Sequence, residues 1–307
     1  MSTTLSSTLS NLLPKFIARA KLRSAEKQVF TQFVDVLQHG AGQGRVYNEP
    51  IIGRLTAYAG SEGVPVGQAQ ALADSNTAWT PTEHLVQVVV TKRAIFVNRE
   101  PILSRANEQM TDALSTRKDT QITTLYGSAT GTNADQGSAG QALLTSLVFQ
   151  AKATVINADD STYGKIPAGP GGQLIFAVNP LSLFDIQEDV LAISTNALAA
   201  TSPLGEYAAE VFKNGMLGNA AGALAGHIAG CLVVQSTAIA PDTADDADNI
   251  VYARDAFVLV ESGGIEDNTD MTQISGRAVE ITMSEWYVAA ERTDGWANAI
   301  TADAAAV

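Results

Sequence analysis

The sequence predicts an α+β fold, and three observations carry that prediction. Runs of β-branched and aromatic residues, typical of sheet strands, occur at 85–97, 249–261 and 277–291. Apolar residues at helical spacing run through 101–126. Residues 140–240 alternate helical and strand patterns, as a mixed α/β segment does. Because the runs that flank this segment share length and character, we expect them to complete one sheet around an inserted domain.

The bulk composition indicates a globular chain and excludes several classes of protein. Hydrophobic residues make up 46% of the 307 residues and charged residues 17%, so a sizeable core is expected. The single cysteine, Cys231, lies in an apolar run, which argues against a disulfide framework or a thiolate metal site. This cysteine usage fits synthesis in a reducing, cytosolic compartment. The N-terminus lacks the basic start and long apolar run of a secretory signal, so it is expected to remain in the product.

The net charge of −13 argues against a dedicated nucleic-acid binder, because binding a phosphate backbone needs Lys and Arg. Only the N-terminus is basic: residues 1–53 hold six Lys and Arg against three Asp and Glu. A helix predicted at 11–38 places four basic residues at four-residue steps, and this basic stripe consists of Lys15, Arg19, Arg23 and Lys27. Like charges at this spacing repel by about 0.2–0.5 kcal/mol per pair, so either the face is solvated or an anionic partner offsets the repulsion.

Residues 61–84 form a stretch of 24 residues without Lys or Arg, between strand-like runs at 54–59 and 85–97. Structureless loops beyond roughly 15 residues are uncommon in compact domains unless they act outside the domain. We therefore predict a long loop whose function lies beyond its own core. The Gly-rich residues 39–44 before it are interpreted as a hinge, because a nucleotide-binding fingerprint needs a strand before its glycines.

A single long helix is predicted after the strand at 85–97. Glu100 and Pro101 suit its first turn, and Gly127 suits its end. From Pro101 to Tyr126 it has 26 residues, or about 39 Å. Such a helix is longer than a small core needs.

The inserted segment is expected to contain a helix, a strand, a second helix and a second strand, at 140–156, 173–178, from 179 onward and at 231–236. Its part at 215–234 has glycines spaced by four, a pattern of transmembrane helix contacts. Gly and Ala gain little from lipid, however, and Asn219 and His227 interrupt the run. We interpret it as a small-residue loop or helix before a strand and expect no membrane span.

No constellation of catalytic residues is visible in the sequence. The three histidines lie in unrelated contexts, and neither a nucleophile elbow nor a P-loop occurs. Acidic clusters at 242–248 and 266–270 lack the spacing of a calcium-binding loop and are interpreted as solvated loops. The sequence therefore predicts no catalytic, cofactor or metal site, and a protein that is not an enzyme.

The order of these elements resembles the tailed-phage major capsid protein family, which has the Hong Kong 97 type fold. The resemblance is most specific over 77–131, which is similar to the family's extended-loop return strand, peripheral-domain strand and spine helix. AGHIAGCLVVQSTAIAP at 225–241 and YARDAFVLV at 252–260 resemble the last axial-domain strand and the return to the peripheral domain. The similarity covers nearly the whole chain.

The resemblance implies five segments. An N-terminal arm would span 1–48 and an extended loop 49–84. The peripheral domain would comprise 85–139, which includes the spine helix, and 241–307. The axial α/β domain would be inserted between them at 140–240.

The family's extended loop reaches over a neighbouring subunit, which implies inter-subunit contacts at Glu62, Val64, Leu72 and Trp79. The basic stripe would lie at the inner side of the shell or clasp neighbours, and would contact packaged DNA without sequence specificity. Some members weld subunits through a loop lysine and a neighbour's asparagine. Because no lysine occurs between Arg54 and Lys92, no such link is expected, although Asn268 lies in an expected turn.

The implied function is that of a major capsid protein, which self-assembles from hexamers and pentamers into the icosahedral head shell around a double-stranded DNA genome. It would be located in the virion after assembly in the host cytoplasm. Implied partners are a portal, a decoration or cement protein and, because only one arm precedes the loop, a separate scaffolding protein. Two alternatives remain: an encapsulin-type compartment shell, against which the long basic arm argues, and an enzyme with an unrecognised site.

Overall fold

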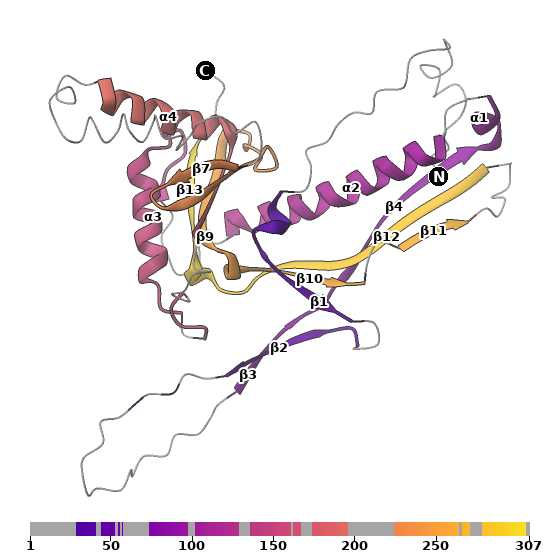
Figure 1. Ribbon diagram of the computed structural model, residues 1–307, viewed down its shortest axis with the longest axis horizontal. Coiled ribbons are helices and arrows are strands. Elements are labelled where there is room, and N and C mark those ends of the chain that lie inside the picture. Colours follow the sequence, from indigo (N-terminus) through magenta and orange to yellow (C-terminus); the bar gives the residue numbers. More distant parts are fainter. Residues whose placement is uncertain are drawn as a thin grey trace, which may run out of the picture.

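Two sheets, between which the chain passes at short 3-10 turns, and a projecting hairpin make up the fold (Figure 1). The computed structural model describes residues 29–40, 44–52, 55, 57, 74–97, 102–128, 136–160, 162–166, 174–195, 224–263, 266–270 and 278–304. The helix α2 (Ile102–Thr124) lies along the first sheet, and α3 (Thr145–Asn157) and α4 (Pro180–Thr195) lie beside the second (Figure 1).

The first sheet has five strands arranged around β12 (Ala278–Glu291). Along one edge β12 pairs antiparallel with β4 (Thr82–Thr91), from Ala278 opposite Thr91 to Tyr287 opposite Thr82. Along the other edge it pairs with β10 (Phe257–Ser262) and β11 (Glu266–Asp270), and β1 (Asp35–His39) adds to β10 in parallel. The expectation that the strand near residue 85 shares one sheet with the C-terminal strands is confirmed for β10 and β12.

The long predicted helix is confirmed as α2, and it packs on this sheet through a small apolar cluster. Met110 and Leu114, one turn apart on α2, contact Val279, Ile281 and Met283 of β12. These three residues alternate along the strand, so they share the face that α2 covers.

The strand predicted at 85–97 ends earlier, because Lys92–Val97 forms the short helix α1. Among the described residues, pairing with β12 stops at Thr91. The β-branched residues Ile95 and Val97 therefore lie in a helix although they favour strands, because propensity is overridden by context.

The second sheet is mixed and has six strands, in the order β5, β13, β9, β6, β8, β7. The strands are β5 (Gln136–Gly137), β6 (Leu174–Val178), β7 (Leu224–Ile228), β8 (Cys231–Gln235), β9 (Asp246–Ala253) and β13 (Ala297–Asp303). All five residues of β6 are buried, as expected of a central strand covered on both faces. Carboxylates of α4 fix the start of α3: Asp185 accepts from the N–H of Leu143, and Asp189 from that of Thr145.

The predicted strand at 249–261 is two strands in different sheets. The 3-10 turn Arg254–Ala256 separates β9, in the second sheet, from β10, in the first. Strand β13 also joins the second sheet, so the segment 241–307 contributes strands to both sheets. A short turn inside a continuous apolar run leaves no composition signal, so the sequence did not reveal this change of sheet.

The helix predicted at 11–38 is wrong for its described part. After the 3-10 turn Phe30–Gln32, residues 35–39 form β1. Asp119 on α2 accepts hydrogen bonds from the N–H of Val29 at 2.6 Å and of Phe30 at 3.2 Å. These bonds to another element hold the segment in a non-helical path; residues 11–28 lie outside the described part.

The long loop predicted at 61–84 is shorter. Strand β2 (Tyr47–Ile52) pairs antiparallel with β3 (Asp74–Trp79), and β4 already begins at Thr82. Polar small residues form β3 because β2 supplies its ladder of hydrogen bonds. The strand predicted at 54–59 falls mainly outside the described residues.

The small-residue run at 215–234 includes the hairpin of β7 and β8. Its turn has Ala229 at φ 54° and Gly230 at φ 77°, the left-handed pair that two-residue hairpin turns require. Within the described ranges, none of the helices has the length and apolar character needed to cross a membrane.

Candidate assembly site

The hairpin of β2 and β3 leaves the body where the two sheets meet (Figure 1). A two-stranded ribbon is marginally stable alone, so its base needs anchors. Three sets of contacts at this base supply them, and we call these residues the hairpin base.

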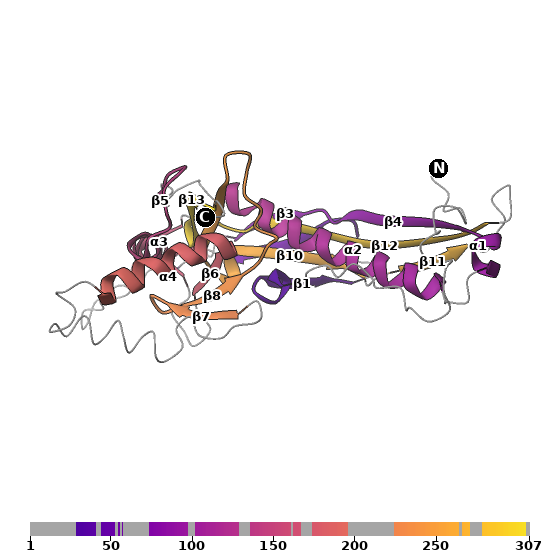
Figure 2. The ribbon, with the colours of Figure 1, turned by 90° about the horizontal axis from the view of Figure 1, so that it is seen from above.

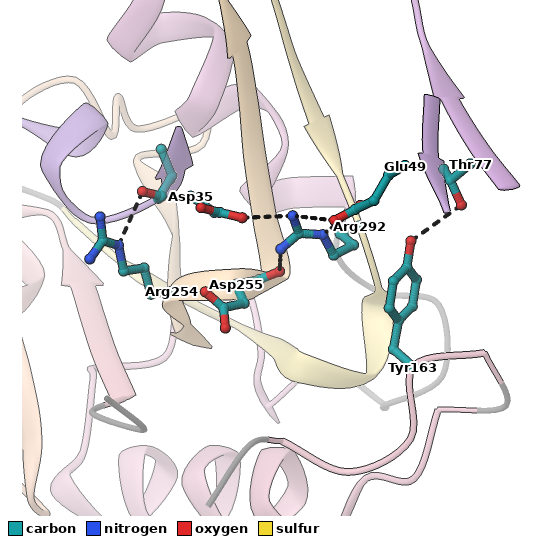
Figure 3. A network of polar contacts seen from close by, with 8 residues as sticks. Asp35, Glu49, Thr77, Tyr163, Arg254, Asp255 and Arg292 are labelled. Carbon is teal, nitrogen blue, oxygen red and sulfur yellow. Dashed lines mark hydrogen bonds and ion pairs between the residues drawn. The ribbon is translucent and has the colours of Figure 1, made fainter. Parts of the chain in front are cut away.

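The first anchor is Arg292, which follows β12 and binds three neighbouring elements (Figure 3). Its guanidinium donates to Glu49 of β2 at 3.1 and 3.0 Å, and to Asp35 of β1 at 2.6 Å. It also donates to the carbonyl of Asp255 at 3.0 Å. The planar fork of arginine suits this multiple pairing.

The charge of Arg292 is secured by its partners. Its side chain is only 7% exposed. Burial lowers the pKa of Arg292, but the hydrogen bonds and charges of Asp35 and Glu49 raise it to a net value above the usual one. The guanidinium therefore stays charged, and it ties the hairpin to β1 of the first sheet and to the 3-10 turn between β9 and β10.

The second anchor is aromatic. Trp79 of β3 stacks on Tyr47 of β2 with ring centroids 6.1 Å apart, and His39 meets Tyr47 edge-on at 5.8 Å. Trp79 packs with Val258 and Val260 of β10. This cluster continues the core of the first sheet into the start of the hairpin.

The third anchor comes from the turn after α3. The hydroxyls of Tyr163 and Thr77 lie 3.2 Å apart, which joins this turn to β3 (Figure 3). Tyr163 is held in turn by an edge-on contact with Trp296, whose indole N–H donates to the carbonyl of Gly164 at 3.0 Å. The second sheet thus braces β3 as Arg292 braces β2.

A buried ion cluster lies further along the first sheet, between α2 and the strands. Lys118 pairs with Glu285 of β12 and, at 2.7 Å, with Glu261 of β10. Its ammonium also lies 5.2 Å from the centroid of the Tyr287 ring. Burial lowers the pKa of Lys118, but hydrogen bonds and charges of both glutamates raise it more, so the net shift is upward.

A second unusual carboxyl is Glu291, the last residue of β12 and the neighbour of Arg292. Burial and the nearby Asp294 carboxyl raise the pKa of Glu291 to about 8. Its Oε1 is buried without a hydrogen-bond partner. Two carboxyls in contact favour a shared proton, so Glu291 is protonated in the folded chain below that pH.

Of the predicted inter-subunit residues, only Trp79 lies in the described part of the chain, and its contact with a neighbouring subunit stays a prediction. It is 7% exposed and packs within its own subunit, because the hairpin base needs an apolar anchor. Glu62, Val64 and Leu72 lie outside the described residues, as does the basic stripe (Lys15, Arg19, Arg23 and Lys27). Asn268, expected in a turn, lies in β11 opposite Thr282.

Sequence reasoning missed Arg292, Lys118 and Glu285. Glu285 carries a signal, since it occupies an inward position in the alternation from Ile281 to Tyr287, where an apolar residue is expected. A charge at such a position calls for a buried partner. Arg292 has no comparable signal, because its partners are distant in sequence.

The described residues offer little for catalysis. Among them no group of three or more His, Cys, Asp or Glu is placed to hold a metal ion. Cys231 is buried in β8, and burial raises the pKa of its thiol to about 11, so it stays protonated at neutral pH.

Comparison with solved structures shows which known fold this chain shares. No family model matches the chain, and no curated protein does. The capsid of Ralstonia phage GP4 is similar with a TM-score of 0.70 at 13% identity, over 95% of each chain. The capsid of Cyanophage P-SCSP1u has a TM-score of 0.66 at 14% identity, over 97% of this chain and 95% of that one. The head structure of Helicobacter pylori bacteriophage KHP40 has a TM-score of 0.66 at 11% identity, over 99% and 98%. This chain therefore shares its α+β fold with these phage capsid and head structures.

Proposed function

We propose that this chain is a major capsid protein, which self-assembles into the icosahedral head shell of a double-stranded DNA phage. The observation that carries the proposal is a capsid fold that matches over nearly the full chain and bears a projecting hairpin. Exposed apolar residues on the hairpin support it: Ile52 is 65% exposed and Leu55 is 54% exposed. Such residues gain from burial against another subunit.

The parts of the chain would then take these roles. The hairpin and the residues between its strands form the extended loop, with Glu62, Val64 and Leu72 in contact with a neighbouring subunit. Helix α2 is the spine helix, and the first sheet is the peripheral domain. The axial domain comprises the second sheet, so it includes β9 and β13 in addition to 140–240.

The partners follow from this role. Hexamers and pentamers of the chain form the shell in the virion, after assembly in the host cytoplasm. The basic stripe at the N-terminus lies toward the packaged DNA or a neighbouring subunit. We also propose a portal, a separately encoded scaffolding protein and a decoration or cement protein that binds the acidic exterior.

The alternatives have less support. An encapsulin-type compartment would share the fold, but the similar structures named above are phage capsids and heads. An enzyme with an unrecognised site has less support, since the similar structures named above are capsids and a head structure.

Light scattering tests self-assembly directly. The purified chain of 32.1 kDa is expected to form capsomers or shells when salt is varied or a scaffolding protein is co-expressed. A stable monomer or dimer under every one of these conditions would contradict the proposal.

A further inference from the structure

The outer edge of β4 has no partner strand in the described part of the chain. Strands β10 and β11 take one edge of β12, and β4 takes the other, so β4 ends the sheet on that side. Figure 2 shows β4 running along the border of the sheet beside β12. Over residues 82–90 this edge is about 30 Å long at 3.4 Å per residue.

Other edge strands of the described chain carry features that discourage pairing with a second chain. Strand β2 contains Pro50, and β7 has an irregular register between Leu224 and Gly226. Strand β11 is acidic, with three carboxylates in five residues. The edges at β1, β3 and β5 are six residues long or fewer. Proline, bulges, charge and short length are the devices by which proteins protect sheet edges.

Strand β4 lacks these devices apart from one charged residue, Glu83. It is ten residues long, with the sequence TEHLVQVVVT, and contains neither proline nor lysine. Its register with β12 is unbroken from end to end. An edge of this length and composition is suited to receive another extended segment.

We propose that β4 pairs antiparallel with β4 of a second copy, around a two-fold axis near Val86, so that one sheet continues across two subunits. Among the described strands, β4 itself is the longest unprotected edge that could serve as its partner. Antiparallel pairing of a strand with itself needs only a two-fold axis. With Val86 on the axis, Glu83 faces Val89 of the partner subunit, so the acidic side chains do not oppose each other.

Side-chain exposure supports the same contact. Leu85 is 59% exposed on β4, and Trp286 is 38% exposed on the adjacent strand. Leu85 lies opposite Ser284, so Trp286 is its diagonal neighbour on the same face. Pairing around Val86 brings the two copies of Leu85 into the same diagonal relation, which covers apolar surface on both. The inference rests on the proposed function in that the second copy is a neighbouring subunit of the shell.

Disulfide trapping tests the pairing. The double variant Leu85→Cys, Gln87→Cys places a thiol pair across the axis whether it passes through residue 85, 86 or 87. Mild oxidation of assembled protein is expected to convert most chains to a reducible dimer. The matched control, Glu280→Cys with Thr282→Cys, lies on the same face one strand further from the edge, and should give about a tenth of that yield or less.

The outcomes of this experiment distinguish a failure of the β4 pairing from a failure of the proposed shell function. Shells in which the edge variant gives no more dimer than the control would overturn the β4 pairing and leave the shell function intact. Dimer without any shell would support the pairing and contradict the shell function. Hydrogen exchange of the unmodified protein gives an independent reading: those amides of 82–90 that point away from β12 should slow at least about 100-fold on assembly, and their unchanged exchange would overturn the inference.

Discussion

At the scale of single residues, the buried ion cluster makes the clearest prediction. Lys118→Met leaves Glu285 buried without its cation, and Glu285 is only 6% exposed. Removing one partner of a buried ion pair costs about 3–5 kcal/mol, so denaturant unfolding should show a loss of that order. Arg117→Met, on the exposed side of the same helix, should change stability by about 0.5 kcal/mol or less.

A second variant separates lost charge pairing from lost packing. Adding Glu285→Gln to Lys118→Met removes the uncompensated charge, so the double variant should be more stable than Lys118→Met alone. If the double variant is instead less stable by the sum of both single losses, the two residues are not coupled.

The raised pKa of Glu291 predicts that the free energy of unfolding depends on pH. Because its folded pKa of about 8 lies above the ordinary value of 4.5, the folded chain keeps a proton that the unfolded chain has lost between these values. The free energy of unfolding therefore falls as pH rises through this window. Glu291→Gln keeps a neutral side chain, so its melting temperature relative to the unmodified protein should rise from pH 5 to pH 8.

The control for this measurement is Glu188→Gln, which changes an exposed glutamate on α4. Its melting temperature should follow that of the unmodified protein across the same range. Parallel pH curves for Glu291→Gln and the unmodified protein would show that Glu291 is not held protonated.

At the scale of elements, the hairpin depends on Arg292. Arg292→Lys keeps the charge but loses the fork that binds Asp35, Glu49 and the Asp255 carbonyl together. Amides of β2 should exchange faster while those of β6 stay unchanged. Arg105→Lys, which alters a partly exposed pair with Glu108 on α2, should leave both strands unaffected. Equal exchange in β2 for both variants would remove Arg292 as the anchor.

The elements also show what the sequence could reveal. The helix α2 and the strands β4, β6, β8 and β12 were predicted because each carries a periodic apolar pattern. Strands β1 and β3 were missed, since DVLQH and DSNTAW lack such patterns and depend on partners from elsewhere in the chain. The hairpin base was missed for the same reason: Asp35, Glu49 and Arg292 are brought together only by the fold.

At the scale of the whole molecule, the absence of lysine between Arg54 and Lys92 predicts a shell without covalent welding through the loop. Boiled, denatured particles should run on a gel as one band near 32.1 kDa. A ladder of oligomers that resists reductant would contradict this expectation. Under the proposed function, the strength of the shell would then come from buried contacts of the loop and arm, from sheet pairing at β4, or from an added cement protein.

The central claim is that this capsid fold builds a closed shell, and negative-stain electron microscopy of the purified, assembled protein tests it most directly. We expect uniform, hollow particles with icosahedral outlines, built from capsomers of five and six subunits. A field of single subunits or small discrete oligomers, seen under conditions in which the chain is folded and a scaffolding protein is supplied, would contradict it.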